Sequence, residues 1–284
     1  MRVLLLLAGC LMLGVSASAD AETPVRKFDG SKIWLWGHDA LSFKGTELGK
    51  RLGETHLDIP DACARLGIPN ACVVRWQGLP AEPFEAYCAK LSGLKSFGWS
   101  VADGDTTVSF AEKADRVVAL AEKFPKLATV WLDGWFEVDS IRQPVSELVK
   151  LRKRLQALPQ KPKLTVVFQS HEFDKNPKPD FDACDQISFW LWHASDIPHA
   201  DELFARCRDL AGPGKPILIA ITLWDMENNK PLERGLMQAQ LAFAANKLNS
   251  EEAAGLIVHC SPLADCDLES VSLLKDWIAS CPRR

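Results

Sequence analysis

Short apolar runs alternate with longer amphipathic segments along this chain, and this alternation limits the folds that the chain can adopt. Eight runs have the length, the β-branched or aromatic content and the flanking turn residues that are typical of strands. They are residues 32–38, 72–77, 97–102, 128–133, 163–171, 186–193, 216–224 and 255–261. Strands that alternate with helices along a chain form a parallel sheet, so the pattern predicts an α/β fold.

Helix signals lie between these runs. Residues 109–124 begin at Ser109 with Glu112 three residues later, which is the spacing of a capping box. Asp267 is the expected N-cap of the last helix. Residues 172–183 contain two prolines and are expected to lack a helix. The other helices are expected within residues 41–67, 83–96, 146–158, 201–210, 232–248 and 268–280.

Eight strand–helix repeats in a chain of 284 residues predict one domain, a closed (βα)8 TIM barrel. A doubly wound open sheet is the alternative. No GxGxxG follows the first strand, so no dinucleotide site and no cofactor are expected. The expected organisation is a signal peptide over 1–19, an N-terminal extension over 20–30 and the barrel domain over 31–284.

The first residues have the pattern of a secretory signal peptide. Arg2 precedes an apolar run, and Ala17-Ser18-Ala19 fits a cleavage site after Ala19. The mature protein is therefore expected to be secreted or periplasmic. The segment ending at Cys10 also resembles a lipobox, which makes a lipid anchor the less favoured alternative. No later run is long enough to span a membrane as a helix.

The number of cysteines agrees with the predicted export of the protein. The chain has nine cysteines, and an even number remains once Cys10 is removed, which predicts disulfides in an exported protein. Cys63–Cys72 and Cys260–Cys266 are the expected pairs, because each brackets a short connection. Metal binding is disfavoured, since the chain has no CxxC and no zinc-finger spacing. The formal net charge is −4 and no basic run occurs, so nucleic acid is not an expected partner.

Polar and aromatic residues gather where the predicted strands end. In a (βα)8 barrel these carboxyl ends carry the functional site. Four of the six histidines and six of the ten tryptophans lie at these strand ends. The chain has ten tryptophans and only one tyrosine, so its polar aromatic content is almost entirely indole. Because side chains alternate along a strand, the sequence also predicts which of them face the lumen. The expected lumen mouth carries His38, Arg75, Gln77, Asp133, Gln169, His171 and His259.

This residue set suits a carbohydrate substrate. Indole faces cover the apolar faces of sugar rings, and polar side chains bond the hydroxyls. Cleavage of a glycosidic bond needs two carboxyl groups that flank it. The candidate catalytic acids are Asp133, Glu137, Asp225 and Glu227, after the fourth and seventh strands. The expected substrate contacts are Trp36, His38, Asp39, Arg75, Gln77, Trp135, Gln169, His171, Glu172, Trp192, Trp224 and His259.

Three segments, FWLWHASD, ITLWDMEN and HCSPLADCDLESV, resemble those of exported bacterial barrel proteins whose activities are largely uncharacterised. The arrangement also resembles the (βα)8 glycoside hydrolases, many of which carry their catalytic acids after strands four and seven. The resemblance implies a glycosidase without a metal. Phe136 precedes Glu137 where the common hydrolase pattern has Asn, and the acids after Asp133-Gly134 are out of register with the chitinase-type DGxDxDxE.

Other interpretations stay open at this point. Asp133 can simply pair with Arg75, Glu137 can be solvated, and the acids after the seventh strand can belong to a loop and a helix cap. A metal-dependent hydrolase would draw its ligands from His38, His171, His193 and His259 with Asp39 or Asp225. A barrel that binds glycans without cleaving them would use the same tryptophans.

Overall fold

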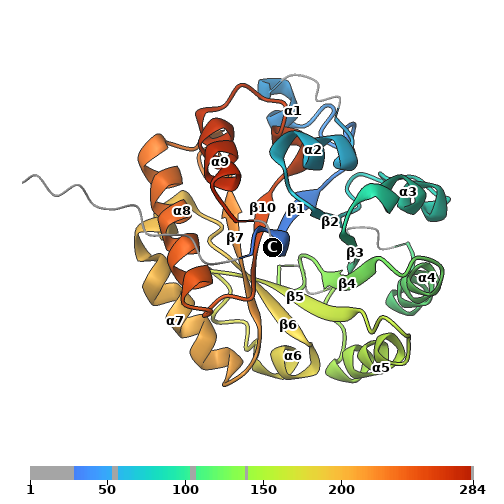
Figure 1. Cartoon of the computed structure of the whole chain (residues 1–284). Coiled ribbons are helices and arrows are strands. Elements are labelled where there is room, and N and C mark those ends of the chain that lie inside the picture. Colours follow the sequence, from blue (N-terminus) through green and yellow to red (C-terminus); the bar gives the residue numbers. More distant parts are fainter. Residues whose placement is uncertain (1–28, 53–56, 103–106, 138–139, 283–284) are drawn as a thin grey trace, which may run out of the picture.

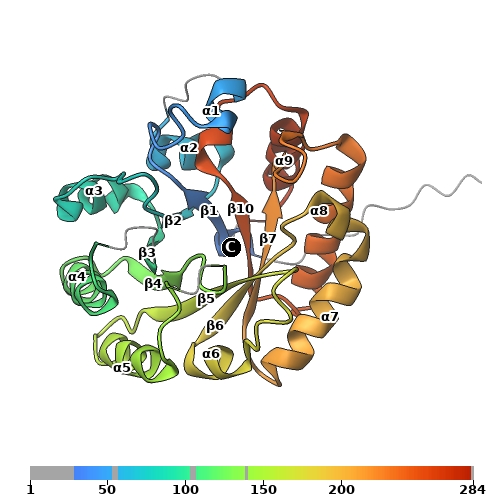
Figure 2. The ribbon, with the colours of Figure 1, turned by 180° about the vertical axis from the view of Figure 1, so that it is seen from behind.

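A computed structural model describes residues 29–52, 57–102, 107–137 and 140–282. Eight parallel strands close into a barrel, and helices surround it in sequence order (Figure 1). The view from behind has the same ring of helices around the sheet (Figure 2). The (βα)8 prediction is therefore confirmed, while the predicted signal peptide and Cys10 lie outside the described residues.

The order of strands around the barrel follows the chain. Each strand pairs in parallel with its sequence neighbours, and the last strand pairs with the first through Ile33 and Leu256. At the base, the amide of Gly30 donates to the carbonyl of Pro282 at 3.1 Å, so the start of the barrel and the end of the chain lie together. The strands are β1 (Ile33–Gly37), β2 (Asn70–Val73), β3 (Ser96–Ala102), β4 (Leu127–Leu132), β5 (Lys163–Gln169), β6 (Gln186–Trp190), β7 (Ile217–Thr222) and β10 (Gly255–His259).

The helices match the predicted segments, with two corrections. A helix does follow β5, because Pro177 and Pro179 occupy its N-cap and first turn, where a missing N–H costs nothing. The N-cap of the last helix is Leu268 and not Asp267. The α-helices are α1 (Glu47–Leu52), α2 (Ile59–Leu66), α3 (Phe84–Lys90), α4 (Phe110–Lys123), α5 (Val145–Gln156), α6 (Lys178–Ala183), α7 (Ala200–Ala211), α8 (Arg234–Asn249) and α9 (Glu269–Ala279).

Short 3-10 helices join several of these elements: η1 (Gly30–Lys32), η2 (Leu91–Gly93), η3 (Ala194–His199) and η4 (Ser261–Leu263). The capping box at the start of α4 is present, with Ser109 and Glu112 bonded reciprocally. None of the helices in the described ranges is long and apolar enough to cross a membrane.

Several strands end before their predicted boundaries. β2 ends at Val73 and β6 at Trp190, while β5, β7 and β10 end at Gln169, Thr222 and His259. The Thr222 hydroxyl donates to the carbonyl of Trp224 at 2.7 Å and stops the strand there. The following residues form a two-stranded hairpin, β8 (Trp224–Asp225) with β9 (Lys230–Pro231). This hairpin changes the direction of the side chains after the seventh barrel strand.

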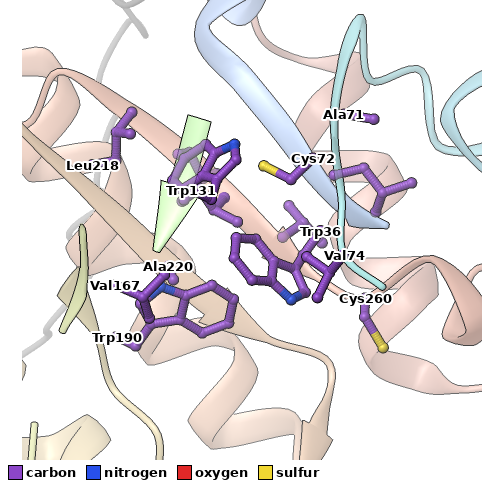
Figure 3. Packing of buried hydrophobic residues seen from close by; sticks show 14 of the residues in the cluster. Trp36, Ala71, Cys72, Val74, Trp131, Val167, Trp190, Leu218, Ala220 and Cys260 are labelled. Atoms are coloured by element: carbon purple, nitrogen blue, oxygen red, sulfur yellow. The ribbon is translucent and has the colours of Figure 1, made fainter. Parts of the chain in front are cut away.

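The lumen is a packed aromatic core. Trp36 from β1 meets Trp131 from β4 and Trp190 from β6 edge to face, with ring centroids 5.5 and 4.9 Å apart. Figure 3 shows these three indoles turned toward one another, with the sulfur of Cys72 beside Trp131. Trp131 is fully buried, as the alternation in β4 predicts. The indoles thus seal the middle of the barrel and form the floor of its mouth.

Glycine at position 98 makes room for this core. A Cβ added there would stand 2.3 Å from Nε1 of Trp131 and 2.6 Å from Cγ2 of Thr129. We expect Gly98→Ala to lower the free energy of unfolding by about 1–3 kcal/mol, because the buried indole must shift. Urea denaturation measures this change.

A matched substitution controls for the added methyl group. Gly235 lies in α8 with no heavy atom within 4 Å of the added Cβ. Gly235→Ala should leave stability unchanged or raise it by up to about 1 kcal/mol, because alanine favours the helix. Equal stability of the two variants would contradict the packing described for Trp131.

The predicted disulfides do not form. The cysteines of both predicted pairs are free thiols, and of these four only Cys266 is not buried. Cys63 lies on α2 outside the barrel, whereas Cys72 is in register with Trp36 and points into the lumen. The β-sheet separates this pair. Cys266 instead donates its thiol to the carbonyl of Pro262 at 3.5 Å.

Candidate functional site

A cavity of about 360 Å³ opens at the carboxyl ends of the strands, above the aromatic floor. Its lining residues are Trp36, His38, Phe43, Arg75, Trp76, Asp133, Gly134, Glu137, Ile141, Val167, Gln169, Trp190, Trp192, Met226 and His259. The structure brings together eight of the residues that the sequence singled out: Trp36, His38, Arg75, Asp133, Glu137, Gln169, Trp192 and His259. Both carboxylates in the lining follow β4.

The loop after β4 explains how these two acids reach the cavity. Asp133 continues the lumen-facing side of the strand, and Gly134 then turns the chain with φ 59°. Trp135 and Phe136 point away from the cavity and are buried. The indole Nε1 of Trp135 donates to Oδ1 of Asp180 at 2.8 Å. Glu137 returns to the cavity, because its two predecessors anchor the loop.

A second set of contacts fixes the same loop from outside. Arg142 pairs with Asp180 at 2.5 Å and donates to the carbonyls of Lys175 and Asn176. Its guanidinium lies 4.9 Å from the centroid of Phe136. The predicted role of Trp135 as a platform for a sugar ring is therefore wrong, since its fully buried indole is a structural anchor.

A chain of hydrogen bonds leads from Glu137 to a buried carboxyl group. The side-chain amide of Gln169 donates to Oε1 of Glu137, and the backbone amide of Gln169 donates to Oε2 of Glu172 at 2.6 Å. Glu172 is 2% exposed and does not line the cavity. Burial raises its pKa to about 8, and the nearby charges of Glu137 and Asp133 act in the same direction.

This shift predicts a dependence of stability on pH. From pH 4.5 to 8 the unfolded chain ionises Glu172 while the folded chain keeps its proton, so stability falls as pH rises. We expect Glu172→Gln to remove this loss of stability. Near pH 8 the free energy of unfolding of the variant should therefore exceed that of the wild type by about 2–4 kcal/mol. Urea denaturation across this pH range measures the difference.

Glutamine can still accept the hydrogen bond from the amide of Gln169, so the substitution tests the charge alone. Glu227→Gln is the matched control, because that side chain is exposed. A constant difference between wild type and Glu172→Gln across the range would show that Glu172 titrates normally in the folded protein.

Two buried histidines face the cavity from β1 and β10. Burial lowers the pKa of His38 to about 4 and that of His259 to about 3, so both imidazoles are neutral at neutral pH. Their Nδ1 atoms and Oε1 of Gln169 are buried and have no hydrogen-bond partner in the part of the chain that the structure describes. Buried polar atoms are normally bonded, so these three can bond a polar ligand.

The acids after β7 do not reach the cavity. Asp225 is buried and accepts hydrogen bonds from the backbone and side-chain amides of Asn228, at 3.1 and 2.9 Å. Glu227 is exposed and accepts from the hydroxyl of Ser195 at 3.2 Å. Trp224 is buried, with its Nε1 on Asn229. The β8–β9 hairpin turns all three away, and Met226 takes their place in the lining.

Three further predicted contacts lie outside the lining. Gln77 is exposed in a turn with φ 51°, after the end of β2 at Val73; within β2 the lumen side is that of Cys72, not the predicted side of Gln77. Asp39 accepts from the amide of Leu41 at 3.1 Å within its own loop. His171 is exposed, with its ring 5.1 Å from that of His193.

Several lining residues were not among the predicted contacts. Trp76 and Trp190 lie at predicted strand ends, and this position in the sequence could have identified them as lining residues. Val167 stands two residues before Gln169 in β5, so the alternation along the strand places its side chain on the lumen face. The loop residues Phe43, Ile141 and Met226 carry no signal in the sequence, since their direction depends on how the loops fold.

The histidines proposed as metal ligands separate into two groups. His38 and His259 lie at the cavity with ring centroids 6.2 Å apart, and His171 and His193 form a pair outside its lining. Within the described ranges, no three His, Cys, Asp or Glu side chains are grouped so that they could hold a metal ion.

Comparison with known proteins identifies the fold and no family. No family model matches the sequence, and no curated protein matches it significantly. An FMN-binding β-glucuronidase from Facaelibacterium prausnitzii L2-6 aligns with a TM-score of 0.53 and 14% identity over 88% of this chain and 44% of that one. This chain therefore spans less than half the length of that enzyme.

Other barrels are about equally similar. Pyruvate kinase from Pyrobaculum aerophilum aligns with a TM-score of 0.52 and 10% identity, over 91% of this chain and 73% of that one. The Bacillus cereus spore cortex-lytic enzyme SleL aligns with a TM-score of 0.49 and 11% identity, over 91% and 76%. At such identities the likeness extends to the TIM-barrel fold alone.

Proposed function

We propose that this protein is a glycoside hydrolase that acts in the cavity at the carboxyl end of its barrel. The observation that carries the proposal is that Asp133 and Glu137 line one cavity together with four indoles, those of Trp36, Trp76, Trp190 and Trp192. Aromatic faces and carboxylates in one concave site are what a sugar and its cleavage need. The fold shared with a β-glucuronidase agrees with this, but a pyruvate kinase has it too.

The proposed roles follow from position along the β4 loop. Asp133, directly after the strand, is the deeper carboxylate and acts as nucleophile or activates a water. Glu137 lies exposed above it and donates a proton to the leaving oxygen. Gln169 positions Glu137 by its hydrogen bond, while its other amide atom and the two neutral imidazoles bond sugar hydroxyls.

A barrel that binds glycans without cleaving them is the second candidate. It is favoured by one observation, that the acids after β7 do not line the cavity: Asp225 is bonded within its own hairpin, and Glu227 accepts from Ser195. Both candidates assign the cavity to a carbohydrate, and both agree with the proposed export of the mature chain.

Reducing-sugar release from a panel of polysaccharides and aryl glycosides separates these candidates. The purified mature protein is assayed with and without a chelator. Turnover that survives chelation is expected for the glycosidase, and turnover lost on chelation would support the metal-dependent alternative. Binding of a panel glycan without any turnover would support the second candidate.

A further inference from the structure

We propose that the cavity is a closed pocket for the terminal sugar of a glycan, and that Trp76 carries the next sugar outside it. The inference rests on the proposed function and deepens it. It makes the protein specific for chain ends, whereas a site that acts inside a chain needs a groove that is open on two sides.

The walls of the cavity come from almost all sides of the barrel. Lining residues lie on or directly after seven of the eight barrel strands. Those of β5 and β10 are strand residues, and the loop after β3 is only partly described. A groove across the mouth would need low walls at two opposite strands. The strand opposite β3 in the closed order is β7, and Met226 forms part of the wall there. The described walls therefore leave no through-going groove.

The size and depth of the cavity favour one sugar. Its volume of about 360 Å³ lies near the lower end of the range of roughly 300–1,000 Å³ for small-molecule sites. The packed indoles of Trp36 and Trp190 close the bottom. A chain that enters such a pocket must do so end first.

Three unpartnered polar atoms belong to residues that line the cavity. His38 Nδ1, His259 Nδ1 and Gln169 Oε1 are themselves buried, so these side chains must turn for the atoms to bond a sugar in the pocket. A terminal sugar brings free hydroxyl groups, which both donate and accept hydrogen bonds. A sugar inside a chain has further positions blocked by its second linkage.

Trp76 has the features of a platform at the rim. It is 46% exposed and lines the cavity, which is unusual for so large an apolar side chain. Its backbone is held by paired hydrogen bonds with Leu79, at 2.8 and 3.0 Å, across the turn formed by Gln77 and Gly78. A fixed, exposed indole beside the opening can stack on the sugar that follows the terminal one.

Two measurements on the same substrates test this inference. Cello-, laminari-, xylo- and chito-oligosaccharides of two to six sugars, labelled at the reducing end, are digested and their first products are separated. Only single sugars and chains shortened by one sugar are expected at early times. Trp76→Ala should lower kcat/KM for these oligosaccharides about two- to tenfold more than it lowers kcat/KM for the matching glycosyl fluorides, which have no second sugar.

Leu41→Ala is the matched control, because Leu41 is also exposed on a neighbouring loop but does not line the cavity. It should change neither reaction. Early products of mixed length, or an equal loss for the fluorides in Trp76→Ala, would overturn the inference and leave the proposed hydrolase intact.

Calorimetric titration covers the case in which no oligosaccharide is cleaved. Affinity that rises from one sugar to two and then levels off, with the gain lost in Trp76→Ala, would support the pocket as a binding site for chain ends and reject hydrolysis. Absence of both binding and cleavage would overturn the inference and the proposed function together.

Discussion

Asp133→Asn should abolish most turnover and leave the fold intact. Removal of a group that takes part directly in bond cleavage lowers kcat by about 10²–10⁴-fold. Asp133 is half-buried at the cavity, directly after β4, and asparagine keeps its size and one acceptor oxygen while an NH2 donor replaces the other. The loss should therefore appear in kcat and not in the unfolding curve.

Initial rates on whichever panel substrate the wild type cleaves fastest measure this effect, with urea denaturation run on the same preparations. Glu227→Gln is the control, because Glu227 carries the same kind of group but lies outside the cavity. Full activity in a normally folded Asp133→Asn protein would exclude Asp133 from the mechanism. An equal loss in both variants would show that the effect is not local to the cavity.

Asp180→Ala should cause the largest loss of stability. Asp180 is fully buried on α6 and accepts from Nε1 of Trp135 and from Arg142. Its removal leaves the buried indole N–H without an acceptor and Arg142 with only its two carbonyl acceptors. Breaking a buried ion pair on one side costs about 3–5 kcal/mol, and the partial exposure of Arg142 places the expected loss at the lower end of that range. Because both partners belong to the segment after β4, the loop that carries Asp133 and Glu137 should loosen as well.

Urea denaturation compares Asp180→Ala with two variants. Asp180→Asn should lose less, since its amide oxygen can still accept from Trp135. Asp182→Ala, on the same helix, removes an exposed pair with Lys178 and should change stability by less than about 1 kcal/mol. Similar curves for all three variants would mean that Asp180 does not anchor the loop.

The alternation along the strands predicted the lumen well where the strands are regular. It assigned Trp34, Trp36 and His38 to the inside of β1, and Trp131 to the inside of β4, and the aromatic contacts agree. It failed in β2, where Cys72 faces the lumen and the predicted side of Arg75 and Gln77 is therefore the outer one, and where the strand ends at Val73 before either residue. The period of two is a property of extended backbone and gives no information once the chain turns.

The loops account for most of the remaining differences at the site. Trp135 and Trp224 stand at strand ends, as a sugar platform would, yet both are buried against side chains of other segments, Asp180 and Asn229. Conversely, Met226 lines the cavity, although the sequence around it does not predict that position. Which side chain a loop presents depends on partners that are distant in sequence.

The barrel could be predicted from the sequence alone, because strand length, helical spacing and turn residues are local properties that repeat eight times. The sequence also determined that the carboxyl ends of the strands would gather acids, imidazoles and indoles. Tertiary contacts were needed to show that the acids after β4 line the cavity while those after β7 do not, and that Cys63–Cys72 and Cys260–Cys266 do not form disulfides. These outcomes depend on hydrogen bonds and packing between segments far apart in the chain, which no local pattern encodes.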